Sequence, residues 1–183
     1  MFGLKDKVVY PGHGVAVIDE IIEKKVAGVS INFFKLNFLF KDVSILIPTN
    51  NLENTGVRYP NNKQAVNDVV KELYKVPVKK LDYLDFTPSG WNRRNKEYQL
   101  KIQGGHLFEI AQIYRDLMYV SQQKDLSFGE KNLLQTAEEL LVQEIQVIRN
   151  QTRDDILQEL HDPFKQFYFH HTGPAQHITS STA

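Results

Sequence analysis

The chain has 183 residues with 22 basic and 22 acidic side chains, so its formal net charge at pH 7 is zero. With 42% hydrophobic and 24% charged residues, its composition is that of a globular protein, which excludes a wholly disordered chain. The lack of cysteine excludes disulfide scaffolds, thiolate zinc sites and cysteine nucleophiles, and favours a cytoplasmic location. No signal peptide and no apolar run of ~20 residues is present, so we expect no membrane contact.

The balanced charge hides a gradient along the chain. Residues 1–60 hold 7 basic and 6 acidic side chains, residues 61–103 hold 9 and 5, and residues 104–183 hold 6 and 11. Binding of nucleic acid by the charge of the whole protein is therefore excluded, but a basic face in the middle third is compatible with it. Such a face binds weakly at cellular salt, so a partner must supply further affinity.

Strand-forming patterns fill the first 60 residues. Five short strands are expected, over residues 8–10, 15–22, 34–38, 43–47 and 55–58. Gly28 lies at the reversal between the second and third strands. In the fourth strand Val43, Ile45 and Ile47 are expected to face inward and Leu46 outward. This spacing predicts an SH3/Tudor-like, five-stranded antiparallel barrel.

From residue 61 the apolar period changes to that of helices. About five are expected: one around 66–73, then 89–103 capped by Ser89, 106–122, a long helix from the capping box Ser127–Glu130 to 149, and 152–160. The prediction is therefore an α+β fold in two domains. A barrel over 1–60 precedes an all-α bundle over 61–160 with a linker at about 76–88, and 161–183 is expected to be a loosely held tail.

Groups for catalysis or metal binding do not converge in the sequence. Gly12-His13-Gly14 is better explained as a hairpin turn than as a phosphate loop, because a strand follows it. His170, His171 and His177 match no familiar metal-ligand spacing and are expected on the surface of the tail. We therefore expect no enzyme activity, no metal and no cofactor.

The segment from Trp91 to Lys101 is the most informative. It joins the single tryptophan of the chain to Arg93, Arg94 and Lys96 at the start of a helix. Trp91, Arg94 and Tyr98 share one helical face, so the indole is expected to be half-exposed or packed against the linker. Three interpretations stay open: a protein-interface anchor, a wedge against distorted or unpaired bases with the cations on phosphates, and a residue that only pins the linker.

The expected barrel also offers a docking surface. Leu46 faces outward on a short strand whose edge is expected to be free. A free edge with an outward apolar side chain is suited to the addition of a strand by a partner.

Several separated motifs make the chain similar to the CarD/CdnL family of bacterial transcription regulators. They lie, in the family's order, at residues 3–15, 47–51, 56–58, 91–94, 109–117 and 126–131, and the resemblance runs from about Leu4 to Leu160. Transcription-repair coupling factors carry a similar barrel, but they are much longer and continue into a helicase motor, which this chain lacks.

The resemblance implies a monomer that binds the β subunit of RNA polymerase through its barrel and promoter DNA through its helical domain. Trp91 would wedge into the minor groove at the upstream edge of the bubble, where it would stabilise the open complex. The implied phosphate contacts are Arg93, Arg94 and Lys96, and the implied polymerase contacts are Lys24, Ser44, Ile45, Leu46 and Pro48. Some members of the family carry arginine at the position of Leu46. The leucine here argues against docking through a salt bridge at this position. The alternative is a protein–protein adaptor that uses Trp91 as an anchor without touching DNA.

Overall fold

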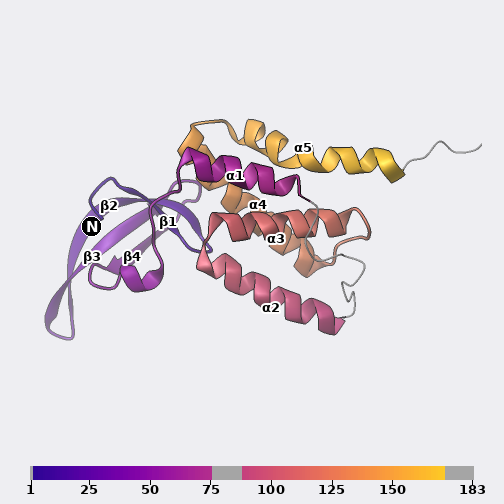
Figure 1. The fold of residues 1–183 in the computed structure, drawn as a ribbon. Helices are drawn as coiled ribbons and strands as arrows, with labels where there is room; N and C mark the ends of the chain where they lie inside the picture. The colour runs from indigo at the N-terminus through magenta and orange to yellow at the C-terminus, as the bar shows by residue number, and fades with distance from the viewer. Residues whose placement is uncertain (1, 76–87, 172–183) are drawn as a thin grey trace, which may run out of the picture.

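The computed structural model describes residues 2–75 and 88–171 and shows an α+β fold. An antiparallel sheet lies at one end of the molecule, and helices form the other end (Figure 1). The sheet has the order β1-β2-β3-β4, from strands β1 (Lys7–Tyr10), β2 (Gly14–Val26), β3 (Val29–Phe38) and β4 (Ser44–Pro48). The helices are η1 (Glu53–Thr55), α1 (Lys63–Leu73), α2 (Pro88–Gly104), α3 (Leu107–Ser121), α4 (Phe128–Arg149) and α5 (Arg153–His171).

The sheet encloses a small apolar core on one face. Alternation along β3 turns Phe34, Leu36 and Phe38 toward this core, as the sequence predicts. Beyond Asn32 the β2–β3 hairpin extends past β4 as a two-stranded arm that points away from the helices (Figure 1). Ala27 and Gly28 both have positive φ at its tip, which confirms the predicted reversal.

The fifth predicted strand is wrong in the described part of the chain. Residues 53–55 form a 3₁₀ turn, and Gly56 with φ of 72° bends the backbone before it can pair. A single bridge between Val9 and Arg58 takes the place of a strand, with N···O distances of 2.7 and 3.2 Å. The predicted inward position of Val43 is also wrong, because this side chain precedes β4 and is 52% exposed.

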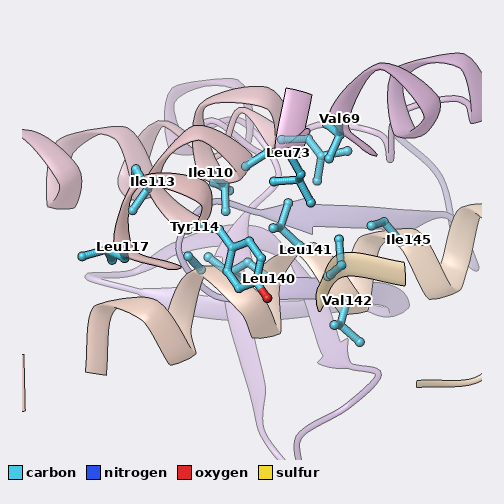
Figure 2. Packing of buried hydrophobic residues seen from close by; sticks show 14 of the residues in the cluster. Val69, Leu73, Ile110, Ile113, Tyr114, Leu117, Leu140, Leu141, Val142 and Ile145 are labelled. Atoms are coloured by element: carbon cyan, nitrogen blue, oxygen red, sulfur yellow. The ribbon is translucent and has the colours of Figure 1, made fainter. Parts of the chain in front are cut away.

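The helices enclose the larger apolar core. Side chains of α1, α3 and α4 converge around the buried ring of Tyr114 (Figure 2). Asn62 caps α1 by accepting a hydrogen bond from the backbone N–H of Ala65 at 2.9 Å. The predicted capping box of α4 is confirmed, since Ser127 accepts from the N–H of Glu130 and the Glu130 carboxylate accepts from the N–H of Ser127.

Two predicted helix ends need correction. α2 begins at Pro88, so Ser89 lies inside the helix and not at its N-cap; proline is well tolerated in a first turn because its missing N–H would have no helical partner. α5 continues through Pro163 to His171 and does not end at Leu160 in a loose tail. Burial of Phe164, whose ring meets that of Tyr114 edge-on at 5.9 Å, offsets the hydrogen bond that Pro163 removes.

The rest of the tail, 172–183, and residues 76–87 of the predicted linker lie outside the described residues, and Pro88, its last residue, begins α2. Among the helices that are described, none has a stretch that is both long and apolar enough to cross a bilayer.

Sheet and helices meet at a polar junction around Arg58. Its guanidinium donates to both oxygens of the Glu144 carboxylate at 2.8 Å, and to the carbonyl of Gly105 at 2.6 and 3.1 Å. Glu144 is 2% exposed and also accepts from the backbone and side chain of Asn61. Nearby, a Cβ at Gly14 would collide with Oε1 of Gln143, so glycine is required for α4 to approach β2. The junction thereby links the sheet to the end of α2.

Candidate functional site

Trp91 lies in the first turn of α2, at the end of the helical domain away from the sheet (Figure 1). It is partly buried, and it packs against the helical core together with Tyr98. The predicted face shared by Trp91, Arg94 and Tyr98 is present, because all three side chains are partly buried along α2. Burial raises the pKa of Tyr98 far above its usual range, which keeps its hydroxyl neutral.

The first turn of α4 supports the indole. A Cβ placed on Gly129 would lie 3.2 Å from Cζ2 and 3.6 Å from Nε1 of Trp91. The edge of the ring therefore rests on the backbone of α4, and a larger residue at this position would displace it. The sequence predicts a half-exposed indole or one packed on the linker, but not its contact with α4. No local signal points to it, since 38 positions separate the two residues.

The predicted cations around Trp91 differ in their surroundings. Arg93 and Lys96 are exposed and have no carboxylate partner among the described residues, whereas Arg94 is partly buried and has an interaction of its own. Farther along α2, Lys101 pairs with Glu97 at 3.0 Å. α2 carries four basic side chains and one acidic side chain, so its solvent-facing surface is positive.

Two further exposed residues lie beside Gly129 in the first turn of α4. Phe128 is 81% exposed, and Lys131 is exposed without a carboxylate partner in the described chain. Phe128 and Lys131 flank Gly129 and Glu130 in the sequence. The capping-box signature at residues 127–130 predicts that a helix starts here, but it does not predict that this helix lies against Trp91. We call Trp91, Arg93, Lys96, Phe128 and Lys131 the basic–aromatic surface.

The edge of β4 is open in the described structure, because β4 pairs with β3 alone. The carbonyl of Val43 accepts from the N–H of Phe38, and the N–H of Thr49 donates to Asn32, so odd-numbered residues of this segment face β3. The backbone groups of Ser44 and Leu46 therefore point to the open edge. Pro48 brings no N–H to that edge, and its carbonyl already accepts from the N–H of Asn51 at 3.0 Å.

The predicted polymerase contacts divide between the two faces of the sheet. Opposite residues of paired strands share a face, which places Ser44, Leu46 and Pro48 outward along β4. Lys24 lies on the same outward face, on the hairpin arm opposite Ile31. Ile45 faces the other way and packs, partly buried, against the core of the sheet.

Three histidines that the sequence places in the predicted tail, at positions 161, 170 and 171, lie on α5. His161 lies on α5 and contacts the Glu138 carboxylate at 2.8 Å, which also accepts from the hydroxyl of Tyr114 at 3.1 Å. Over residues 2–75 and 88–171, histidine and carboxylate side chains form no group of three or more suited to a metal ion. Of the other predicted tail histidines, His170 and His171 end α5, and His177 lies outside the described residues.

Comparison with known proteins assigns both parts of the chain to one family. Residues 2–59 match the CarD-like/TRCF RID domain, and residues 84–161 match the C-terminal domain of CarD. A relative in Bacillus subtilis (strain 168), named "Putative transcription factor YdeB", is 28% identical over 156 residues, which cover 85% of this chain and 97% of that protein. The chain therefore belongs to the CarD/CdnL family of transcription factors.

Proposed function

We propose that this protein binds the β subunit of RNA polymerase through the open edge of β4 and stabilises the promoter open complex by inserting Trp91 into the minor groove at the upstream end of the bubble. The observation that carries the proposal is the position of the indole. It is partly exposed on a helix that also carries the exposed cations Arg93 and Lys96, at the end of the molecule opposite the sheet (Figure 1).

Docking uses the backbone groups of Ser44 and Leu46. Two exposed residues whose N–H and C=O groups point outward can pair with a strand of the partner. Leu46, which is 37% exposed, supplies an apolar contact on the outward face, and Lys24 supplies a charge on the hairpin arm. A domain of the RID type, which is RNA polymerase-interacting in kind, supports this assignment of the sheet.

The DNA contacts are weak by themselves and depend on docking. Arg93, Lys96 and Lys131 can neutralise about three phosphates, and Arg94 can reach the backbone only if its present interaction is replaced. Attachment to polymerase raises the effective DNA concentration to the millimolar range. A wedge in the minor groove distorts the duplex without reading bases, so the protein acts on promoters without sequence specificity.

Docking is tested by co-purification of polymerase with the variant Leu46→Glu. A carboxylate on the edge of β4 should reduce the polymerase recovered by at least about tenfold, because a buried unpaired charge is strongly unfavourable. Leu100→Glu is the matched control, since Leu100 is an exposed leucine on α2. Equal recovery of polymerase with the wild type and Leu46→Glu would place docking elsewhere.

A second function is favoured by the contact of Trp91 with Gly129, which already buries part of the ring. The protein would then be an adaptor that binds another protein through Trp91 and never meets DNA. Crosslinking from position 91 in the presence of polymerase and promoter separates the two functions. Crosslinks to DNA that require polymerase support the wedge, and crosslinks to protein alone support the adaptor.

A further inference from the structure

Phe128 is the most exposed of the large apolar side chains described, with 81% of its surface in solvent. It is the first residue of α4, where the capping box of Ser127 and Glu130 already satisfies the helix start. The ring therefore contributes little to the core or to the cap. Single exposed apolar residues are common, so the surroundings of Phe128 decide whether it has a role.

Phe128 shares its turn with the support of Trp91. Gly129, the next residue, is the one on which the edge of the indole rests, with 3.2 Å between its Cβ position and Cζ2. The two aromatic side chains therefore flank the same backbone turn. Trp91 is partly buried there, while Phe128 leaves most of its ring free.

The charges around this pair favour an anionic partner. Arg93, Lys96 and Lys131 are exposed and lack carboxylate partners in the described chain. Glu130 lies in the same turn but is 3% exposed, and its carboxylate is held by Lys124 at 2.8 and 3.0 Å. Asp125, three residues before Phe128, is the exposed acidic residue nearest to it along the chain.

We infer that Phe128 is a second apolar contact to nucleic acid, which stacks on an unpaired base or sugar beside the position of Trp91. Nucleic acid is the partner class that needs both features of this surface, because its bases stack on rings while its phosphates bind cations. The inference rests on the proposed function and extends it: the DNA-binding element is a pair of rings contributed by α2 and α4.

The test measures the lifetime of promoter open complexes formed by RNA polymerase holoenzyme with the full-length protein. Phe128→Ala should shorten the lifetime at least about fivefold, since one stacked base contributes about 1–3 kcal/mol, and Phe128→Tyr should preserve it. Phe108→Ala is the matched control, because Phe108 is an exposed phenylalanine in the first turn of α3, at the end of that helix nearer the sheet (Figure 1). In a Trp91→Ala background the effect of Phe128→Ala should shrink, because both rings act on the same step.

The outcomes separate this inference from the function on which it rests. If Trp91→Ala shortens the lifetime and Phe128→Ala and Phe128→Gln do not, the inference is overturned and the proposed function stands. If none of these variants changes the lifetime, the proposed function fails and the inference with it. If Phe128→Ala weakens binding to polymerase in the absence of DNA, Phe128 contacts protein and the inference is overturned.

Discussion

Gly129 helps to set the position of Trp91, because the absence of a side chain at this residue leaves room for the indole. It lies in the first turn of α4 without a positive φ, so the requirement for glycine comes from the indole packed above it and not from the backbone conformation. A residue that touches neither partner can in this way set the exposure of the aromatic ring proposed to enter DNA.

Gly129→Ala is predicted to leave the free energy of unfolding unchanged or to raise it, since alanine in a helix is favoured over glycine by about 0.5–1 kcal/mol. The added Cβ should shift the ring, which must move because the approach of 3.2 Å is tight. Fluorescence of the single tryptophan, with quenching by acrylamide, measures this shift. Gly104→Ala is the control, because its Cβ would meet its nearest neighbour at 3.6 Å. If the emission spectrum and quenching of Gly129→Ala are identical to those of the wild type, the indole does not rest on the backbone at this residue.

Among the helices and strands, those that depend on residues close in sequence are predicted correctly, whereas those that depend on contacts between distant residues are not. The capping box of α4 uses residues three positions apart, so it is visible in the sequence. The extension of α5 depends on Phe164 meeting Tyr114 from another helix, and a proline inside the helix conceals it. The predicted fifth strand does not form, because the chain makes a 3₁₀ turn and then bends at Gly56. The alternation of apolar residues does not reveal this turn.

The same limit applies to the candidate site. The start of α2, with Trp91 and its cations, is predicted from spacing because the residues are close in sequence. The contribution of α4 is not, because only the packed bundle brings Gly129 to the indole. On the sheet, alternation places Leu46 outward correctly, while Ile45, expected to contact polymerase, faces the core.

The start of α4 is predicted to be sensitive to acid through Glu130. Burial opposes its charged form, but hydrogen bonds from Lys124 and Ser127 outweigh burial and lower the pKa of this carboxyl below its usual value. A carboxyl with a depressed folded-state pKa stabilises the fold above its unfolded pKa of about 4.3 and loses this effect as the pH falls through the folded value.

Glu130→Gln should therefore lower the free energy of unfolding by about 1–2 kcal/mol at pH 7, and the difference from wild type should shrink below about pH 4. Denaturant unfolding at a series of pH values measures it. Lys131→Gln, which changes the charge of the next residue on the surface, is the control. A difference between Glu130→Gln and wild type that stays constant down to pH 2 would contradict the role of this charge.

At the scale of the whole molecule, the junction at Arg58 joins the sheet to α2 and α4, the helices that carry the basic–aromatic surface. The guanidinium belongs to the chain that leaves the sheet, while its partners are Glu144 of α4 and the carbonyl after α2. Glu144 is 2% exposed and Arg58 is partly buried, so the attraction of the guanidinium is needed to offset the loss of hydration of the carboxylate.

Arg58→Met is predicted to destabilise the protein by roughly 3 kcal/mol, because it leaves the Glu144 carboxylate buried without its partner. The double variant Arg58→Met/Glu144→Leu should recover a large part of this loss, since it removes both charges. A double-mutant cycle in denaturant unfolding measures the coupling between them. Losses that simply add across the two single variants would show that the pair does not act as a unit.

The most direct test of the account is the dissociation rate of open promoter complexes after challenge with a DNA competitor, compared for wild type and Trp91→Ala. Polymerase binding should be equal for the two proteins, because Trp91 and the edge of β4 lie at opposite ends of the molecule (Figure 1). The account predicts that complexes with Trp91→Ala dissociate at least about fivefold faster, the loss expected when one wedging ring is removed. Equal dissociation rates with both proteins bound to polymerase would contradict it.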